Sequence, residues 1–428
     1  MTTTMHSPHQ NALPGPENIT RVELQNGITI LARENFNSPT LSIKGYLPSG
    51  SLFDPDEKLG LSYLTAGSLM TGTAHEDFQS LYNKIESAGA QLGFSAGTLT
   101  TSFSVHCLSE DLDLMLGLIG DCLRSPSFPD REFNRLKIQM LTGLAIRSQD
   151  TAEMAALLFD QIVYAGHPYE RPDEGFIETV QAIEREDLVN FYRRTFGPKG
   201  LVIAIVGAID SKKAVESIRT ALGDWTNPGQ EDLPTLPDLN SQEKAVRKSL
   251  SIPGKSQADI VIGCQAPDRL SPDYYALRVG NNILGEFGMM GRLGKRVRED
   301  AGLAYYAYSS LSAGIGPGAW EMIAGVNPRD IDQTIDLIQQ EVIEFTSHPV
   351  KPEELSDSKS NFLGRMPLLL ESNSGVAVSL LNMERFNLGL DYFLRYPEII
   401  QSITAEKILE ASRKYLDPDR LAVAVAGP

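Results

Sequence analysis

The sequence contains few of the residues that build disulfide frameworks or metal clusters. Its 428 residues include only three cysteines and six histidines. The cysteines, Cys107, Cys122 and Cys264, are an odd number at unrelated spacings, so they predict neither a disulfide framework nor a zinc ribbon. We expect reduced and mostly buried thiols, as in a protein of a reducing compartment.

The histidines also lack the spacing of a metal site. Two imidazoles can hold one zinc ion when they stand four residues apart on a helix, with a glutamate beside them as base. No pair in this sequence has that arrangement, and His75-Glu76 is followed by no zinc motif. We therefore expect no metal ion in this chain. Ordinary surface or core roles are expected for His6, His9, His75, His106, His167 and His348.

Long apolar runs and basic clusters are also missing. No apolar segment approaches the length that spans a bilayer, and the start "MTTTMHSPHQNALPGPENIT" has neither the apolar core nor the basic flank of a secretory signal. The net charge is −17, whereas nucleic-acid binders normally present a basic face. The sequence predicts a cytoplasmic protein with no membrane or nucleic-acid partner and a loose arm over residues 1–20.

The remaining composition is that of a globular protein with more than one domain. Hydrophobic residues make up 42% of the chain and charged residues 22%. A single hydrophobic core stops growing at about 250–300 residues, so a chain of 428 residues predicts at least two cores.

An internal repeat defines those domains. The segment "QAIEREDLVNFYRRTFGPKGLVIAIVG" (Gln181–Gly207) aligns without a gap with "QSITAEKILEASRKYLDPDRLAVAVAG" (Gln401–Gly427), 220 positions later. Both contain a short amphipathic helix, a proline turn and an apolar strand that ends in glycine. The match extends upstream, and its period is too long for a solenoid. We interpret it as a duplicated domain.

Each copy mixes strands with helices in the manner of an α+β fold. "TRVELQNGITILARENF" predicts a hairpin with Asn26-Gly27 at its turn, and "LTTSFSVHCL" alternates as a strand. We expect two homologous domains, each a mainly antiparallel sheet with helices packed on one face, over residues 21–223 and 245–428. Residues 224–244, with three prolines and no periodicity, predict the linker.

The repeat and two motifs resemble the pitrilysin/insulinase (M16) family of zinc peptidases. These motifs are "GLSYLTAGSLMTGT" (Gly60–Thr73) and "GRLGKRVREDAGLAYYAYSS" (Gly291–Ser310), and the resemblance extends from about Arg21 to the end. The branch that it resembles most is the short-chain one, which includes mitochondrial and bacterial processing peptidases. The family implies a clamshell of four domains, of which this chain provides two.

The first motif lacks the zinc ligands and the catalytic base of the family. Active members carry H-x-x-E-H on this helix, where two histidines bind zinc and the glutamate takes a proton from the zinc-bound water. Here Tyr63 and Gly67 occupy the histidine positions and Ala66 the glutamate position. The third zinc ligand of the family would fall near Leu141-Thr142-Gly143, where no acid stands. The resemblance therefore implies a non-catalytic chain.

A glycine-rich segment, "GEFGMMGRLGKR", places Gly285, Gly288 and Gly291 three residues apart. It lacks the G-x-x-x-x-G-K-[ST] spacing of a phosphate-binding loop. In the family this stretch is a substrate-handling loop of the non-catalytic subunit. A plain turn into the next helix remains the alternative.

Arg298 and Tyr305, in "VREDAGLAYYAY", are the predicted site residues. Gly302 predicts the end of a helix at about Asp300, after which a strand begins and returns beside the last helical turn. In the family, an arginine and a tyrosine at this spacing complete the active site of a partner, by binding peptide carbonyls and the oxyanion. The alternatives are an Arg298 paired with a nearby acid, a Tyr305 packed in its strand, and Tyr306 as the exposed tyrosine.

The resemblance implies a subunit that is inactive alone and lacks zinc. Paired with an M16 chain that bears H-x-x-E-H and the zinc, it would bind unfolded, extended peptide and complete the active site of a heterodimer. Two alternatives stay open: a structural, core-protein-like subunit of a membrane complex, and a peptide-binding homodimer without catalysis.

Overall fold

The computed structural model describes residues 13–428. The chain forms two compact units. The first comprises residues up to 144, 172–235 and 366–396, and the second comprises residues 145–171, 236–365 and 397–428. Residues 1–12 of the predicted arm, which include His6 and His9, lie outside the described residues.

The first unit contains a six-stranded sheet in the order β1-β2-β6-β3-β5-β4. Neighbouring strands are antiparallel except for β2 and β6, which run parallel. The predicted hairpin is present, because β1 and β2 pair around Gly27, whose φ of 88° suits the turn. The strands are β1 (Thr20–Glu23), β2 (Thr29–Glu34), β3 (Thr40–Leu47), β4 (Gln91–Ala96), β5 (Thr101–Leu108) and β6 (Val202–Gly207).

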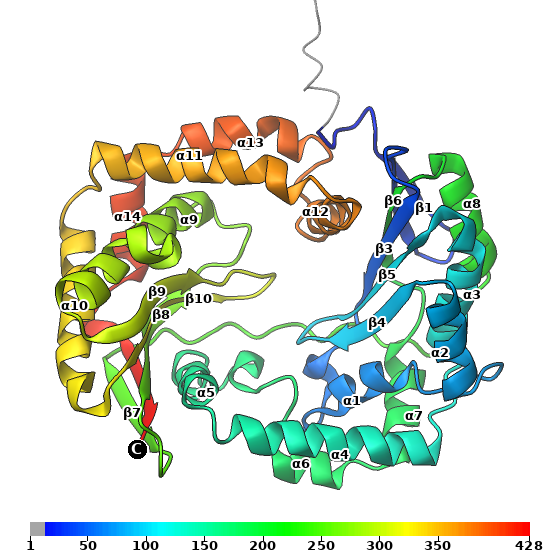
Figure 1. Cartoon of the computed structure of the whole chain (residues 1–428), viewed down its shortest axis with the longest axis horizontal. Coiled ribbons are helices and arrows are strands. Elements are labelled where there is room, and N and C mark those ends of the chain that lie inside the picture. The colour runs from blue at the N-terminus through cyan, green and yellow to red at the C-terminus, as the bar shows by residue number, and fades with distance from the viewer. Residues whose placement is uncertain (1–12) are drawn as a thin grey trace, which may run out of the picture. The chain divides into compact units, whose positions relative to one another are not determined.

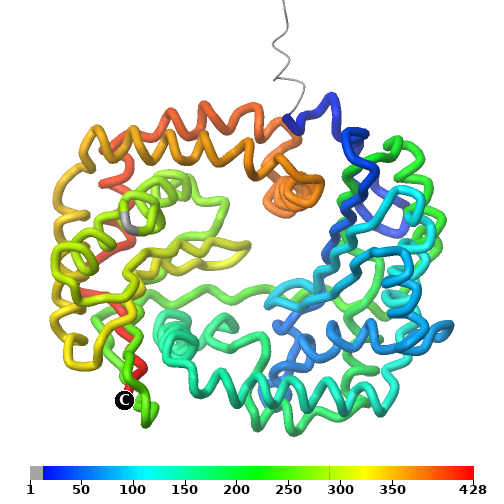
Figure 2. Tube along the Cα trace, viewed as in Figure 1, coloured from blue at the N-terminus to red at the C-terminus, as the bar shows by residue number. Residues whose placement is uncertain are grey.

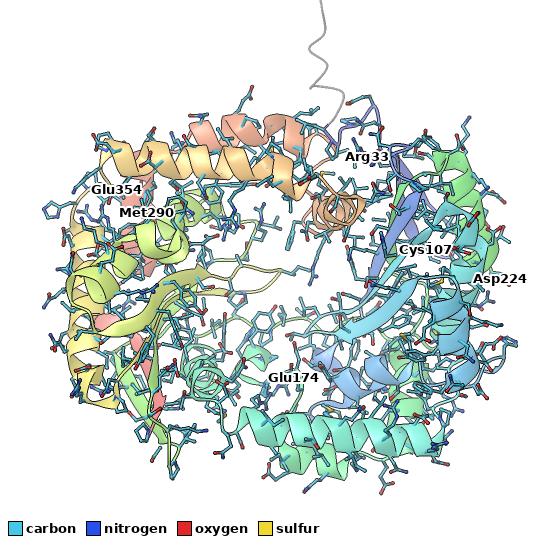
Figure 3. All side chains as sticks on the ribbon, viewed as in Figure 1. Arg33, Cys107, Glu174, Asp224, Met290 and Glu354 are labelled. Atoms are coloured by element: carbon cyan, nitrogen blue, oxygen red, sulfur yellow. The ribbon has the colours of Figure 1, made fainter. Side chains whose placement is uncertain are left out.

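Helices cover one face of this sheet and bury its main core (Figure 1). Every second residue of β5 is buried, and these residues, Thr101, Phe103, Val105 and Cys107, face the helices. Cys107 is therefore a buried thiol (Figure 3). The helices of this part of the chain are α1 (Leu61–Ser68), α2 (Phe78–Ser87), α3 (Leu112–Arg124), α4 (Asp130–Arg147), α6 (Ile177–Ala182), α7 (Arg185–Thr195) and α8 (Ser211–Leu222).

The second unit repeats this plan with five strands, in the order β7-β11-β8-β10-β9. Only β7 and β11 run parallel. Its strands are β7 (Val246–Ser251), β8 (Ala258–Ala266), β9 (Ala304–Leu311), β10 (Gly318–Val326) and β11 (Ala422–Gly427). The helices that follow the linker are α9 (Tyr274–Asn281), α10 (Ile331–Ser347), α11 (Pro352–Leu369), α12 (Asn373–Arg385), α13 (Tyr392–Gln401) and α14 (Ala405–Tyr415). The predicted α+β fold with two similar, mainly antiparallel sheets is confirmed.

The repeat read from the sequence reappears in the coordinates. Helix α7 and strand β6 begin and end 220 positions before α14 and β11. Both strands are buried along their whole length, which requires apolar cover on both faces of each sheet.

One helix from each half of the chain provides the cover on the second face. In the first unit α12 packs on β6 and β3, and Figure 2 shows this orange segment beside strands in blue. In the second unit α5 (Thr151–Val163) packs on β11 and β8. These helices, both 13 residues long, hold corresponding places in the two halves, so each compact unit includes a helix from the other half.

Two further observations concern the chain between and within the units. Residues 224–244 form neither helix nor strand, as the prolines of this segment predict. Within residues 13–428, no helix combines the length and the apolar character that crossing a membrane requires.

Candidate functional site

Helix α1 carries the degenerate motif and is anchored at its start by Asp54. The carboxylate of Asp54 accepts hydrogen bonds from the backbone N–H groups of Gly60 and Ser62, at 3.0 and 2.9 Å, and from the Ser62 hydroxyl at 3.1 Å. The carboxylate thereby satisfies two backbone N–H groups that would otherwise have no acceptor at the helix start. Burial raises the pKa of Asp54 to about 7, although the hydrogen bonds from Ser62 and Gly60 oppose the shift.

The helix keeps the geometry of a two-ligand face without the ligands. Tyr63 and Gly67, four residues apart, are both exposed, and they are the exposed positions of α1. Ala66, in the position of the base, is 0% exposed. A Cβ added at Gly67 would meet no atom within 4 Å, so there is room for a larger side chain at this position.

The neighbouring positions provide no replacement ligands. Thr142, at the place of the third ligand, lies exposed on α4 and donates its hydroxyl to the Ile138 carbonyl at 2.9 Å. Residues 13–428 contain no group of three or more histidine, cysteine or acidic side chains that could hold a metal ion. The residues present in the first unit therefore do not fit the zinc ion of the resembling peptidases.

The second predicted site lies in the second unit, where a helix turns into an edge strand. The π-helical segment η8 (Gly294–Asp300) ends just before Gly302, whose φ of 67° is left-handed, and β9 begins at Ala304. Within the described residues β9 pairs with β10 alone. The turn predicted at Gly302 is thus confirmed, and it precedes a strand with one free edge.

Arg298 differs from the two arginines that precede it in the chain. Arg292 forms a bidentate pair with Glu354, at 2.7 Å for both contacts, and Arg296 binds Glu341 at 2.5 Å. Arg298 is exposed, and among the described residues it has no ion-pair or hydrogen-bond partner. The alternative in which a nearby acid neutralises Arg298 is therefore not what the structure contains.

Tyr305 and Tyr306 lie on opposite faces of β9. The Tyr305 side chain is 64% exposed and has no partner among the described residues. Tyr306 is half-buried and donates its hydroxyl to the buried carboxylate of Asp259. Burial, followed by this contact with Asp259, raises the pKa of Tyr306 well above its usual range. Of the two tyrosines, Tyr305 has the hydroxyl that remains available to a ligand.

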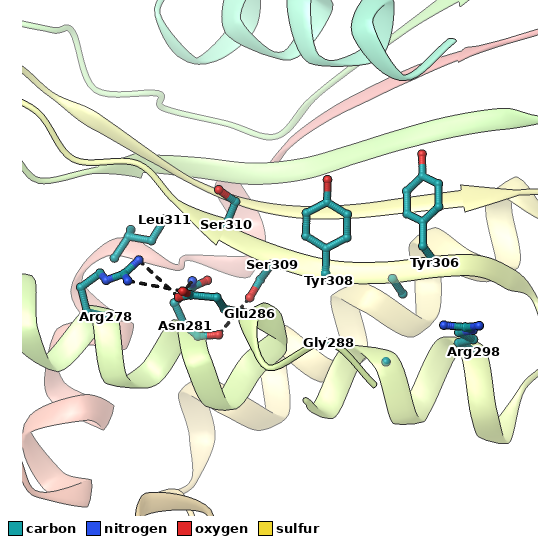
Figure 4. A pocket seen from close by; sticks show the side chains of 12 residues that line it. Arg278, Asn281, Glu286, Gly288, Arg298, Tyr306, Tyr308, Ser309, Ser310 and Leu311 are labelled. Atoms are coloured by element: carbon teal, nitrogen blue, oxygen red, sulfur yellow. Dashed lines mark hydrogen bonds and ion pairs between the residues drawn. The ribbon is translucent and has the colours of Figure 1, made fainter. Parts of the chain in front are cut away.

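A cavity of about 520 Å³ lies between β9 and the helical segments before it (Figure 4). Arg298 and Gly288 line it, as does the strand from Tyr306 to Leu311. Figure 4 shows the rings of Tyr306 and Tyr308 rising from one side of the strand. Tyr305 does not line this cavity. The structure thus places Arg298 at the cavity and Tyr305 outside it, on the exposed surface of the strand.

The same cavity contains a polar cluster that no sequence motif predicts. Glu286 accepts hydrogen bonds from Arg278 at 3.3 Å and from Asn281 at 3.0 Å (Figure 4). Asn281 also accepts the indole N–H of Trp320 at 2.8 Å. These residues belong to no motif, because the π-helical turn η6 (Asn282–Glu286) is what brings Glu286 back beside α9.

The three glycines of the glycine-rich segment have different surroundings. A Cβ at Gly285 would lie 2.5 Å from the Ser309 amide nitrogen, and one at Gly291 would lie 2.8 Å from the Gly285 Cα. Gly285 thus allows close packing of the segment on β9, and Gly291 allows close packing against Gly285. Gly288, with a φ of 63°, faces open space and lines the cavity.

Comparison with known proteins places this geometry in a family. The profile of the family described as insulinase (peptidase family M16) matches residues 29–172, and that of the peptidase M16 inactive domain matches residues 182–362. Together the two profiles match well over half of the chain. The chain belongs to peptidase family M16.

Relatives of this M16 chain include an uncharacterized zinc protease of Mycobacterium leprae, 23% identical over 96% of this chain and 92% of the relative. Another is subunit 1 of the human mitochondrial cytochrome b-c1 complex, 25% identical over 62% of this chain and 55% of the relative. The solved structure of a peptidase M16 inactive domain from Pseudomonas fluorescens superposes with a TM-score of 0.89 at 25% identity, over 96% of this chain and 98% of that one. These matches support a non-catalytic M16-type chain.

Proposed function

We propose that this M16 chain is the non-catalytic subunit of a heterodimeric zinc processing peptidase. One contrast carries the proposal. The helix that would bind zinc has Tyr63, Ala66 and Gly67 in place of its ligands and base. By contrast, Arg298 and Tyr305 are exposed and have no partner among the described residues. Exposed side chains that make no contact of this kind are available to act on a ligand or on another chain.

The two side chains suit two tasks in the cleavage of a peptide bond, namely substrate binding and stabilisation of the oxyanion. The Arg298 guanidinium presents a fixed fork of N–H donors that binds carbonyl oxygens of the substrate. The Tyr305 hydroxyl donates to the oxyanion that forms when water attacks the peptide carbonyl. In this proposal zinc and the base belong to the partner chain, which bears H-x-x-E-H, and this chain needs no cofactor of its own.

Unfolded, extended peptide is the substrate class that the edge strands favour. Strands β4 and β9 each pair with one neighbour only among the described residues, so each has a row of free backbone N–H and C=O groups. An extended peptide can add to such an edge through its own backbone, independently of its sequence. The loop of Gly285, Gly288 and Gly291 would handle the same substrate beside β9.

A structural subunit is the second candidate function. Two relatives favour it, because they are named as subunit 1 of the mitochondrial cytochrome b-c1 complex, from human and from cattle. A peptide-binding homodimer would also have no need for a metal. The exposed Arg298 and Tyr305 favour the peptidase subunit, since a purely structural role does not require them.

We propose the cytoplasm as the location of this chain.

Co-purification of the tagged chain from its native cell is the decisive experiment. We expect a second M16 chain with intact H-x-x-E-H in the eluate, and zinc-dependent cleavage of an unfolded peptide by the pair. Recovery with subunits of a membrane complex and no cleavage would support the structural function. A homodimer with no second chain, which binds but does not cleave the peptide, would support the third alternative.

A further inference from the structure

A second hollow lies in the first unit, on the sheet face that α12 only partly covers. Its volume is about 460 Å³, and it is bounded by β3, β4 and β5 below and by α12 at the side. It is separate from the degenerate α1 motif and from the cavity beside β9. Strand β4, which forms its rim, is one of the two edge strands of the sheet.

The floor of the hollow is made of residues in register on three strands, and three of them are serines. Across the three strands, Lys44 is opposite Ser104, which is opposite Gly93, and the next row joins Tyr46, Ser102 and Ser95. A Cβ at Gly93 would meet no atom within 4 Å, so the space above it is open. Among the described residues, the hydroxyls of these three serines have no hydrogen-bond partner, and they are therefore available as donors.

Two cations border this floor, and neither has a counter-ion among the described residues. Arg385 extends from the end of α12, with its Cζ atom 5.6 Å from the Tyr46 ring centroid. Its Nε is buried and has no hydrogen-bond partner within residues 13–428. Lys44 is half-buried and, within residues 13–428, makes no ion pair or hydrogen bond. The adjacent acid, Glu384, is already engaged by Arg21 at 2.7 Å.

The hollow therefore has an unbalanced charge. Among the described residues, no aspartate or glutamate lines it, although acids outnumber bases by 55 to 38 in the whole chain. A buried donor on a cation is costly when it has no acceptor, and a bound anion removes that cost. The planar guanidinium matches the two oxygens of a carboxylate, and the serine hydroxyls can donate to the same group.

We propose that this hollow binds a carboxylate of an extended peptide, held by Arg385 and Lys44 above the serine floor. The inference rests on the proposed peptide-binding function and names a chemical preference for it. A peptide that added to the free edge of β4 would direct every second side chain toward this sheet face. Either an acidic side chain or the C-terminal carboxylate can supply the group.

The test uses the full chain and three labelled 12-residue peptides of low complexity, followed by fluorescence anisotropy. The first carries one glutamate and an amidated C-terminus. The second replaces that glutamate with glutamine. The third keeps the glutamine and has a free C-terminus. Arg385→Gln and Lys44→Gln remove one charge each from the hollow, and Lys213→Gln removes an exposed charge from α8 as the matched control.

We expect at least one carboxylate-bearing peptide to bind about tenfold or more tightly than the neutral peptide, because hydrogen bonds to charged groups have that effect. Arg385→Gln and Lys44→Gln should each reduce this preference while affinity for the neutral peptide stays unchanged, which shows that the unit remains folded. The first peptide reports an acidic side chain and the third a C-terminus. Equal binding of all three overturns the carboxylate site and leaves peptide binding intact. Binding of none overturns both proposals.

Discussion

The hydroxyl of Tyr306 donates a hydrogen bond to the carboxylate of Asp259, which is 1% exposed in the second unit. Asp259 also accepts a hydrogen bond from Thr151 at 2.5 Å, so the carboxylate joins β9 to the start of α5. This contact separates the two adjacent tyrosines of β9 by role. Tyr306 stabilises the packing of β9 through Asp259, and the hydroxyl of Tyr305 remains available to a ligand.

Removal of each tyrosine hydroxyl should therefore affect stability differently. Tyr306→Phe should lower the free energy of unfolding by roughly 1–3 kcal/mol, because it leaves a buried carboxylate with one donor fewer. Tyr305→Phe should change it by less than about 0.5 kcal/mol, as expected at an exposed position. Urea unfolding of both variants beside the wild type measures the difference. Equal destabilisation by the two variants would contradict the assignment.

The same Tyr305→Phe variant tests the catalytic role in a reconstituted pair. Loss of one oxyanion donor should lower kcat by roughly 10²- to 10³-fold while the complex still assembles. Single-turnover cleavage of a model peptide measures the rate, and sedimentation checks the assembly. An unchanged rate in an intact complex would favour the structural subunit over the peptidase subunit.

Arg298→Ala should act on substrate binding as well as on the rate. An arginine that contacts peptide carbonyls before and during the reaction contributes to both states, so KM should rise alongside any fall in kcat. Lys295→Ala is the matched control, because Lys295 is an exposed cation of the same segment. If both variants raise KM equally, the effect comes from general charge and Arg298 has no special role.

Metal content tests the fit of α1. We expect the purified chain to hold only substoichiometric zinc after dialysis, since Tyr63 and Gly67 provide no imidazole. The double variant Tyr63→His/Gly67→His should gain zinc, because both positions are exposed and lie four residues apart on one helical face. Elemental analysis of both proteins decides the matter. One zinc per wild-type chain would disprove the non-catalytic assignment.

Two buried acids of the second unit should make the stability of the chain depend on pH. Burial raises the pKa of Glu321, on β10, to about 7, and burial followed by repulsion from Glu321 raises the pKa of Asp160, on α5, to about 7. Unfolding returns both groups to their usual range near 4. The folded chain therefore binds more protons than the unfolded chain between about pH 4 and 7.

The free energy of unfolding should accordingly fall as pH rises through that window and level off above pH 7. Glu321→Gln removes one of the two carboxylates and lessens the repulsion on Asp160. We expect the variant to be more stable than the wild type at pH 8, by up to about 3 kcal/mol, with a flatter pH profile. Thermal unfolding at a series of pH values measures both. A wild-type profile that rises between pH 4 and 7 would have the opposite sign to this prediction.

Sequence periodicity predicted the parts of the fold that depend on neighbouring residues. The copies of helix and strand that end at Gly207 and Gly427 were visible because their apolar spacing is local and repeats after 220 positions. The helix end near Gly302 followed from one residue that tolerates a left-handed backbone. The loss of the zinc ligands at Tyr63 and Gly67 could be recognised from the sequence motif alone.

The tertiary structure decided what depends on residues far apart in the chain. Helix α12 packs on the first sheet and α5 on the second. A local sequence pattern shows that a helix has an apolar face, but it does not show on which sheet that face packs. The choice between Tyr305 and Tyr306 required Asp259, which lies 47 positions earlier than Tyr306. The hollow below Arg385 likewise exists only because α12 ends above β3, since a sequence records which side chains are present but not which ones meet.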